Sequence, residues 1–521
     1  MKATFAQEPL LQQRLFSLPH NAHNIMKRIF TLIAAVCALQ LTTHAQTPVT
    51  DTTNTTPAQR YVAIERDYAD EQQPESNPIL LDRLEDWKDL KFGFMVHWGI
   101  YSQWGVVESW SICSEPWVSR KGADYMSYVQ NYRNLNRTFK PTKFDATRWA
   151  KNVAGAGMKY IIFTAKHHDG FCMFDSKYTN YTISDKSCPY SKKMDNDVAR
   201  QIIETFRNKG FWTGVYFSKP DWHHPDYWAP EWATPDRNVN YDPKQDPDRW
   251  NRFCDFTFNQ VYELTHNYGP IDILWLDGGW VRPSWSMTNE ARSWLGCHGY
   301  VQDVNVPRIA KMAREHTPDL LIVDRGVGGR YENYTTYEQR VPDSYNPEPW
   351  ECCMSMGDSW SYLPQDNYKS TNTLIHTLCD VVAKGGNLLL NVGPDSYGVL
   401  PDTAVLRLKE IGQWMKLNSE AIYATRPAFP FVDGQWRFTQ TKDAKTVYAI
   451  YLIPEGQTMP EVVTLPKLDR EPLKVEMLAK GGSVKMRREG DQTQLYVHPN
   501  EASKHAVVIK VIFEKGKKGK P

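Results

Sequence analysis

The stretch Ile271-Asp272-Ile273-Leu274-Trp275-Leu276-Asp277-Gly278-Gly279-Trp280 runs from apolar residues into an aspartate followed by two glycines. A short apolar run bounded by glycine predicts a buried strand. The acid at its end would lie at the rim of a buried sheet, where burial and neighbouring charges set its protonation state. We therefore expect Asp277 to be a catalytic carboxylate. The alternative is a strand-end cap that binds a neighbouring backbone amide.

Similar apolar runs alternate with amphipathic helical stretches throughout residues 80–428. They predict parallel strands, several of which end in polar or charged residues; the expected strands are 92–98, 160–164, 212–217, 271–276, 320–323 and 386–392, and the polar ends are His97, Lys166-His167-His168-Asp169, Ser218-Lys219, Asp277 and Asp324-Arg325. In a (β/α)8 barrel such ends line the reaction face, so the pattern predicts a TIM-like barrel with its site there. A doubly wound open sheet is the alternative, but no glycine-rich phosphate loop follows the first strand.

The C-terminal part has a different pattern. Short alternating runs at 446–453, 473–478, 494–497 and 506–513 predict an antiparallel β-sandwich over residues 429–515. Residues 516–521 form a basic tail, which we expect to be solvated.

The N-terminal part is typical of an exported protein. Met26-Lys27-Arg28 precedes an apolar run at 29–41 and the small-residue segment Thr43-His44-Ala45, so residues 1–45 are predicted to be a leader and signal peptide. The run is shorter than the roughly 20 residues of a membrane span. Residues 46–79, rich in Thr, Gln, Pro and acids, are predicted to be a flexible tether. We expect a periplasmic or extracellular protein without a membrane span.

Composition excludes some classes of partner. Formal net charge is +1, from 61 basic and 60 acidic residues, so no global field attracts nucleic acid or an anionic membrane. Aromatic residues make up 13% of the chain, and aromatic faces suit the C–H faces of sugars, although a large core accounts for most of them.

Cofactor binding is not indicated either. The cysteines show no CxxC pair and no small-scaffold density, which argues against a zinc site or a disulfide framework, while one or two disulfides remain possible. A metal-dependent hydrolase is the rival enzyme class, because a barrel with histidines at its strand ends can bind zinc. However, His97 has no second histidine two residues away. We expect no metal and no other cofactor.

Taken together and in order, several motifs resemble one family, the α-L-fucosidases of glycoside hydrolase family 29. They are Phe94-Met95-Val96-His97-Trp98-Gly99, Lys166-His167-His168-Asp169-Gly170-Phe171, Leu274-Trp275-Leu276-Asp277-Gly278, Asp324-Arg325, Tyr334-Thr335-Thr336-Tyr337-Glu338-Gln339 and Gly385-Gly386-Asn387-Leu388-Leu389-Leu390-Asn391-Val392-Gly393-Pro394. The resemblance covers roughly residues 80–425. It implies a retaining hydrolase that acts by double displacement.

That reaction requires one ionised carboxylate to attack the anomeric carbon and a second, protonated carboxyl group to protonate the departing oxygen. The resemblance places the nucleophile at Asp277. It places the acid/base at Glu338, in a Thr-x-Glu segment after the Asp-Arg pair, with Glu351 in Pro349-Trp350-Glu351 as the alternative.

Further residues are expected to bind the sugar. Imidazoles donate to and accept from hydroxyls, and an arginine makes charge-assisted hydrogen bonds, so His97, His167, His168 and Arg325 are candidate ligands. The alternative for the histidines is a hydrogen-bonded core position, and the alternative for Arg325 is a structural ion pair with Asp324 or a helix end. The resemblance adds residues that line the fucose site, with Trp360 facing the sugar methyl group; these are Tyr216, Trp275, Trp360 and, by similarity to an adjacent Glu-Trp pair that Pro116 interrupts here, Glu115 and Trp117.

The function that the resemblance implies is an exo-acting retaining α-L-fucosidase. Its substrate would be a fucosylated oligosaccharide or glycoconjugate, with no nucleic-acid partner. Two alternatives remain open: a non-catalytic carbohydrate-binding protein on the same scaffold, and a glycosidase for a related sugar such as L-galactose. The oligomeric state and the linkage preference are not predicted.

Overall fold

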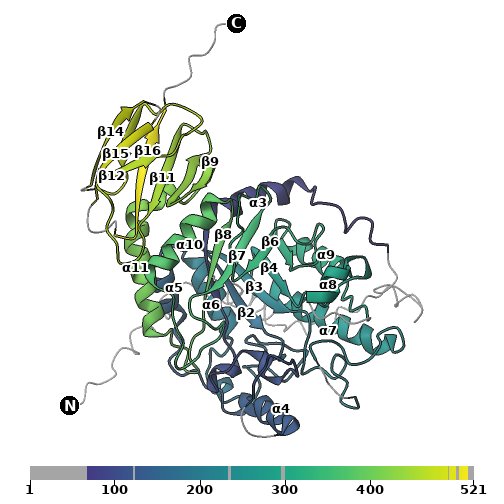
Figure 1. Ribbon diagram of the computed structural model, residues 1–521. Helices are drawn as coiled ribbons and strands as arrows, with labels where there is room; N and C mark the ends of the chain where they lie inside the picture. Colours follow the sequence, from purple (N-terminus) through teal and green to yellow (C-terminus); the bar gives the residue numbers. More distant parts are fainter. Residues whose placement is uncertain are drawn as a thin grey trace, which may run out of the picture. The chain divides into compact units, whose positions relative to one another are not determined.

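The computed structural model describes residues 67–120, 124–232, 236–294, 300–480, 482–490, 492–499 and 504–513. Helices surround a parallel sheet in the larger part of this region, and antiparallel strands form the C-terminal part (Figure 1). The predicted leader and signal peptide, residues 46–66 of the tether and the basic tail lie outside the described residues.

Eight parallel strands make a nearly closed barrel in the order β5-β4-β3-β2-β1-β8-β7-β6. An isolated bridge from Val323 to Glu332 links β5 to the segment before β6. This confirms the predicted barrel. The strands are β1 Phe92–Val96, β2 Tyr160–Lys166, β3 Trp212–Ser218, β4 Ile273–Asp277, β5 Leu321–Asp324, β6 Thr335–Glu338, β7 Trp350–Ser355 and β8 Asn387–Val392.

The barrel helices begin at side chains that suit helix N-termini. Asp197, Asp246 and Ser370 each accept a hydrogen bond from a backbone N–H of the first turn, which satisfies a donor that has no intrahelical partner. The helices of the described region are α3 Pro78–Leu90, α4 Tyr125–Arg133, α5 Ala146–Gly155, α6 Val198–Asn208, α7 Pro247–His266, α8 Asn289–Trp294, α9 Val306–His316, α10 Thr371–Ala383 and α11 Asp402–Asn418.

Two barrel strands differ from the sequence prediction. The six predicted strands are present with ends shifted by up to two residues, but β6 and β7 were not predicted. Strand β6 is a polar segment with exposed ends, and β7 carries Glu351 among buried residues. Neither has the continuous apolar run from which a buried strand can be recognised.

The C-terminal strands form two antiparallel sheets, which confirms the predicted sandwich. The sheet orders are β13-β16-β11-β10-β9 and β12-β15-β14. Phe438, Ile509, Leu495 and Val497 pack in the core shared by the two sheets. The strands are β9 Thr425–Asp433, β10 Trp436–Thr441, β11 Thr446–Leu452, β12 Val462–Leu465, β13 Lys474–Met477, β14 Ser483–Glu489, β15 Gln492–His498 and β16 Ala506–Ile512. Strand β9 begins at Thr425, so the sandwich starts slightly before the expected boundary at residue 429.

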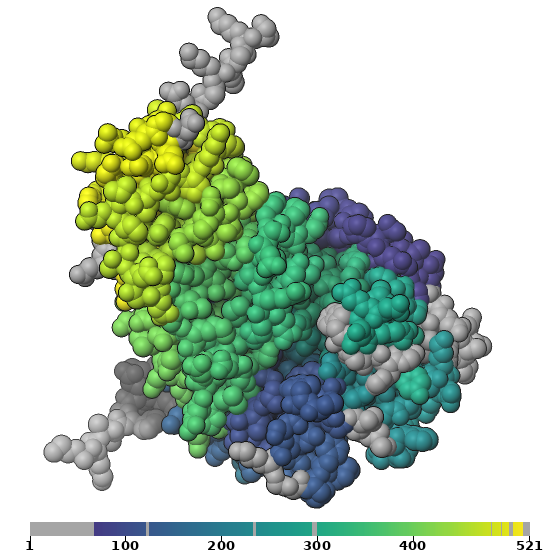
Figure 2. Space-filling model, viewed as in Figure 1, coloured from purple at the N-terminus to yellow at the C-terminus, as the bar shows by residue number. Residues whose placement is uncertain are grey.

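The barrel and the sandwich share one cluster of buried apolar residues. Tyr448, Ile450 and Ala506 of the sandwich belong to the same buried cluster as the barrel helices. The indole Nε1 of Trp414 in α11 donates to the backbone oxygen of Ala506 at 3.0 Å. In Figure 2 the light-green residues of the first sandwich strands adjoin the green residues of α10, which contacts β9 and β10. The sandwich therefore supports the helices that follow β7 and β8.

Within the described part of the chain, no helix combines the length and the apolar character needed to cross a membrane.

Candidate active site

A cavity of about 240 Å³ opens at the carboxyl ends of the barrel strands. Its lining includes three carboxylates, three imidazoles, two guanidinium groups and four indoles. The lining residues are Met95, His97, Glu108, Trp110, His167, His168, Tyr216, Arg237, Trp275, Asp277, Gly279, Trp280, Arg325, Gly326, Thr336, Glu338, Cys353 and Trp360. Nine of the eleven residues predicted as site residues are among them.

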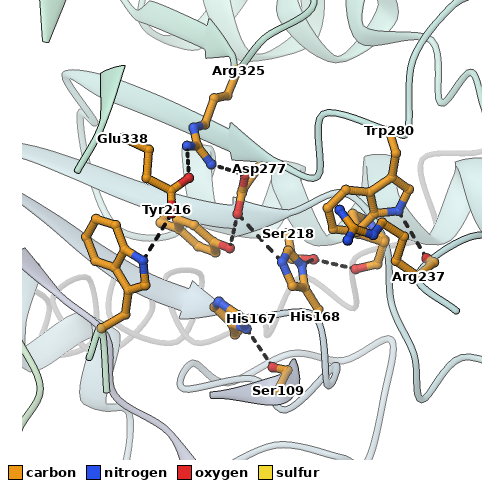
Figure 3. Close-up of polar contacts among 12 residues, drawn as sticks. Ser109, His167, His168, Tyr216, Ser218, Arg237, Asp277, Trp280, Arg325 and Glu338 are labelled. Atoms are coloured by element: carbon orange, nitrogen blue, oxygen red, sulfur yellow. Dashed lines mark hydrogen bonds and ion pairs between the residues drawn. The ribbon is translucent and has the colours of Figure 1, made fainter. Parts of the chain in front are cut away.

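Asp277 ends β4 and points into this cavity with 13% of its side chain exposed. Its Oδ2 accepts from the Tyr216 hydroxyl at 2.6 Å, and its Oδ1 lies 3.1 Å from Nη1 of Arg325 (Figure 3). Burial alone would raise the pKa of Asp277. The positive charge of Arg325 and the hydrogen bond that Tyr216 donates outweigh burial and hold this pKa below its usual value. Asp277 is thus an ionised carboxylate in a buried position, which is what a nucleophile requires.

Gly278 allows the chain to turn directly after this aspartate. Its φ is +89°, in the left-handed region that favours glycine, and a Cβ there would lie 2.2 Å from Cδ of Pro220. The glycine that follows Asp277 in the sequence is therefore required by the turn that presents the carboxylate.

Glu338, at the end of β6, is joined to Asp277 through one guanidinium group. Arg325 Nη2 contacts Glu338 Oε2 while Nη1 contacts Asp277, and Nε donates to Thr336 Oγ1 at 3.1 Å. The other oxygen of Glu338 accepts from the indole Nε1 of Trp360 at 3.2 Å. Unlike Asp277, Glu338 is 44% exposed. The cavity therefore contains one enclosed and one accessible carboxyl group, and both lie beside Arg325.

Glu351, the alternative acid/base, does not line the cavity. It is fully buried in the barrel, where Tyr160 donates to Oε2 at 2.7 Å and the indole of Trp275 donates to Oε1 at 3.3 Å. Burial raises its pKa to about 7. The register of β7 directs Glu351 into the barrel core. Its side chain therefore contacts Tyr160 and Trp275 and does not face the cavity.

The three predicted histidines converge on the cavity. His97 Nδ1 lies 2.8 Å from Asn391 Oδ1, His167 Nδ1 lies 2.6 Å from Ser109 Oγ, and His168 Nδ1 lies 2.7 Å from Ser218 Oγ. Burial lowers the pKa of His97 and of His168 to about 4 and also lowers that of His167. At neutral pH these imidazoles are uncharged, so they can exchange hydrogen bonds with sugar hydroxyls.

The tautomer of His168 follows from its partner. Ser218 donates its single hydroxyl proton to the backbone oxygen of Pro220, so it accepts from Nδ1 of His168. Nε2 of His168 is then an acceptor, 3.7 Å from Oδ2 of Asp277. A substrate hydroxyl group placed next to Asp277 would find an acceptor there.

Aromatic rings also line the cavity. Tyr216 stacks on Trp275 with ring centroids 5.3 Å apart, and Trp360 lies 5.0 Å from the ring of His97. Tyr216, Trp275 and Trp360 are all lining residues, as expected from the sequence.

Glu115 and Trp117 are not brought to the cavity. Glu115 Oε1 lies 2.6 Å from Nε of Arg237, and Trp117 is 55% exposed, with its ring 5.4 Å from that of Trp110. Glu108 and Trp110, each seven residues earlier, line the cavity instead. The Glu108-Ser109-Trp110 segment was the signal for them, since it too is a closely spaced Glu and Trp.

Glu108 is the third carboxyl group of the cavity, and it was not predicted from the sequence. It is buried, and its Oε1 accepts from the backbone N–H of Ser361 at 2.7 Å. Burial raises the pKa of Glu108 to about 7. A carboxyl group in this state can donate or accept a hydrogen bond at a sugar hydroxyl.

Arg237 and Trp280 were also missed as site residues. Arg237 lies in the long segment between β3 and α7, and Trp280 follows the two glycines after β4. No local pattern identifies an arginine within an irregular segment as a cavity residue, because its position depends on tertiary packing.

Two other features bear on cofactors and disulfides. Among the described residues, no group of three or more His, Cys, Asp or Glu side chains is arranged to hold a metal ion. Six cysteines of the described region, Cys113, Cys172, Cys188, Cys352, Cys353 and Cys379, are buried thiols outside any disulfide.

Comparison with known proteins is consistent with this geometry. A family model described as alpha-L-fucosidase matches residues 61–420. The plasma alpha-L-fucosidase of Homo sapiens is 29% identical over 397 residues, which cover 71% of this chain and 76% of that protein. Alpha-L-fucosidase isoenzyme 1 from Paenibacillus thiaminolyticus superposes with a TM-score of 0.67 and 29% identity, covering 84% of this chain and all of that one. A Bacteroides thetaiotaomicron alpha-L-fucosidase, trapped as a covalent intermediate with 2-fluoro-fucosyl fluoride, shares the fold, with a TM-score of 0.61, 23% identity and coverage of 84% and 97%.

Proposed function

Since the chain belongs to the α-L-fucosidase family of glycoside hydrolases, we propose that it removes terminal α-L-fucosyl groups from oligosaccharides or glycoconjugates with retention of anomeric configuration. Asp277 is the nucleophile and Glu338 the general acid/base. The observation that supports this most strongly is that Asp277 and Glu338, from different strands, face one cavity and contact the same guanidinium group.

In the first half of the reaction, the carboxylate of Asp277 attacks the anomeric carbon and Glu338 protonates the departing glycosidic oxygen. Tyr216 and Arg325 hold Asp277 in its ionised state. In the second half, Glu338 removes a proton from water, which attacks the same carbon and releases Asp277. Two carboxyl groups beside one guanidinium are compatible with the roughly 5–5.5 Å separation of retaining enzymes.

The degree of exposure of the two acids fits these roles. The nucleophile contacts only the sugar and benefits from exclusion of water, while the acid/base must meet both a leaving group and a water molecule. Asp277 is mostly enclosed and Glu338 is nearly half exposed. The related Bacteroides thetaiotaomicron enzyme was captured as a covalent intermediate, which supports a double displacement here.

A panel of three variants tests the assignment. We expect Asp277→Ala to lose turnover of an aryl α-L-fucoside by at least about 10³-fold while L-fucose binding remains. Glu338→Ala should slow poor leaving groups far more than activated aryl groups, because only poor ones need protonation. The anomeric configuration of the released fucose, followed by NMR, should be the same as in the substrate.

Glu351→Gln is the matched control for the acid/base. It removes a carboxyl group that hydrogen bonds within the core but does not reach the cavity, so its effect should not depend on the leaving group. The assignment would be wrong if Glu351→Gln showed leaving-group dependence and Glu338→Ala did not.

We also propose that the protein is exported to the periplasm or the extracellular space. The support is the basic, apolar and small-residue order of residues 26–45, and the similarity to a protein named as a plasma enzyme. N-terminal sequencing of the protein from its native cells tests this, and a mature chain that retains residues 1–45 would contradict it.

A further inference from the structure

Arg237 is a cavity residue for which the proposed reaction has no role. It comes from the segment between β3 and α7 and faces the cavity with 16% of its side chain exposed. Neither carboxyl group of the reaction contacts it. Its position therefore calls for another explanation.

The side chain of Arg237 is held rigidly. Its guanidinium carbon lies 4.8 Å from the ring centroid of Trp110 and 5.3 Å from that of Trp280, so it contacts two indoles. Nε is fixed to Glu115 Oε1 at 2.6 Å. Such a guanidinium loses little further freedom when it binds a ligand.

The backbone of Arg237 is anchored as well. Its carbonyl oxygen accepts from Trp222 Nε1 at 3.1 Å, the Tyr227 hydroxyl at 3.0 Å and Trp280 Nε1 at 3.0 Å. Two of these donors are buried indoles, and one of them, Trp280, lines the cavity. The structure thus fixes both ends of the residue beside the cavity.

The terminal nitrogens of Arg237 are the part available to a ligand. Within the part of the chain that the structure describes, only Nε of this guanidinium has a hydrogen-bond partner. The acceptor Nε2 of His168 belongs to a ring that lies edge-on to the same two indoles, with ring centroids 5.4 Å apart for Trp110 and 5.1 Å apart for Trp280. A donor and an acceptor that contact the same two indoles suit a hydroxyl group, which both accepts and donates.

The position of Arg237 and Trp280 relative to the two carboxyl groups indicates which part of the substrate they contact. In Figure 3, Glu338 lies to one side of Asp277, and Arg237 and Trp280 lie to the other. The leaving group departs toward Glu338, so the Arg237 side faces the sugar that remains on the enzyme. This polar side of the cavity matches the hydroxyl-bearing edge of that sugar.

Resting on the proposed function, we propose that Arg237 is a specificity-determining residue that binds the hydroxyl groups on C2 and C3 of the fucosyl ring, and that Glu115 positions its guanidinium. This gives Glu115 an indirect role in sugar binding. It also makes recognition depend on a residue outside the strand-end motifs.

The test measures binding of L-fucose, 2-deoxy-L-fucose and 3-deoxy-L-fucose by calorimetry. Arg237→Met keeps an aliphatic stem between the indoles but removes the donors, and it should weaken L-fucose binding by about 10- to 100-fold. For at least one deoxy sugar the difference between wild type and variant should fall to about threefold or less. Arg237→Lys, which retains the charge without the planar fork, should be intermediate.

Arg249→Met is the matched control. Arg249 also lies over an aromatic ring, 5.4 Å from that of Tyr241, and pairs with Glu231 at 2.6 Å, but it does not line the cavity. The Arg249→Met variant should bind L-fucose as tightly as the wild type does. Glu115→Gln should weaken binding in the wild-type background but not in the Arg237→Met background, because Glu115 acts through Arg237.

Several outcomes would overturn the inference. One is an Arg237→Met variant that binds L-fucose as tightly as Arg249→Met does. Another is an equal loss for L-fucose and both deoxy sugars. A loss confined to turnover of oligosaccharides, with aryl fucosides unaffected, would place Arg237 against the leaving group instead. Because the primary measurement is binding, it remains decisive even if the proposed catalytic roles of Asp277 and Glu338 fail.

Discussion

At the scale of single residues, charge states in this site are set by contacts that the barrel brings together. Asp277 stays ionised because Arg325 and Tyr216 contact it, whereas His97 and His168 stay neutral because they are buried. Asp277 is negative and paired with the cationic Arg325, while His97 and His168 are uncharged hydrogen-bonding groups over the same pH range. These charge states suit the binding of an uncharged sugar.

We predict that kcat/KM for an aryl α-L-fucoside falls as the pH drops through about 4. Protonation of His97 and His168 below that pH removes the ring acceptors expected to bind hydroxyls, while the lower pKa of Asp277 keeps the proposed nucleophile ionised down to a lower pH. The pH profile of the free enzyme should therefore show a histidine limb that moves in His168→Gln. An identical acid limb in wild type and His168→Gln would contradict this.

The sequence identified residues that follow strand ends, and little beyond them. His97, His167, His168, Asp277 and Arg325 were predicted because parallel strands bring their carboxyl ends to one face. Glu338 came from the resemblance alone. Glu108 and Arg237 were missed because they lie in irregular segments between elements, whose path over the barrel depends on packing among distant residues.

At the scale of elements, the turns that follow the strands decide where the acids point. Strand β4 is a buried run that the sequence reveals, and the glycine after it is required by the left-handed turn beside Pro220. Strand β6 has no such signal because its side chains are polar and partly exposed. One acid thus belongs to an element that periodicity predicts and the other to an element that it does not.

We predict that Gly278→Ala lowers kcat/KM by more than about tenfold and destabilises the protein by about 1–3 kcal/mol, because the new methyl group meets Pro220 and φ is positive. Gly210→Ala is the control: its φ is +80°, but nothing lies within 4 Å of its Cβ position. It should lose some stability and keep its activity. Thermal unfolding and aryl fucoside kinetics measure both, and equal activity in the two variants would argue against a turn that positions Asp277.

At the scale of the whole molecule, the sandwich and the barrel are energetically connected through buried contacts. Tyr448 and Ile450 lie in the barrel-side cluster, and Trp414 donates across to Ala506. The sequence predicted a barrel followed by a sandwich but not this connection, because alternation along a strand does not say what its apolar face packs against.

We therefore predict a single cooperative thermal transition for barrel and sandwich in calorimetry. Trp414→Phe, which leaves the backbone oxygen of Ala506 without its donor, should lower the free energy of unfolding by about 1–3 kcal/mol and leave KM unchanged. Two separate transitions, with only one affected by Trp414→Phe, would show that the parts unfold independently.

The guanidinium of Arg325 has a consequence for the order of events in a double displacement. In the double displacement proposed above, esterification would remove the charge of Asp277, and the same cation would then face Glu338 alone. A single fixed positive charge would therefore serve two partners in turn, without any movement of the backbone.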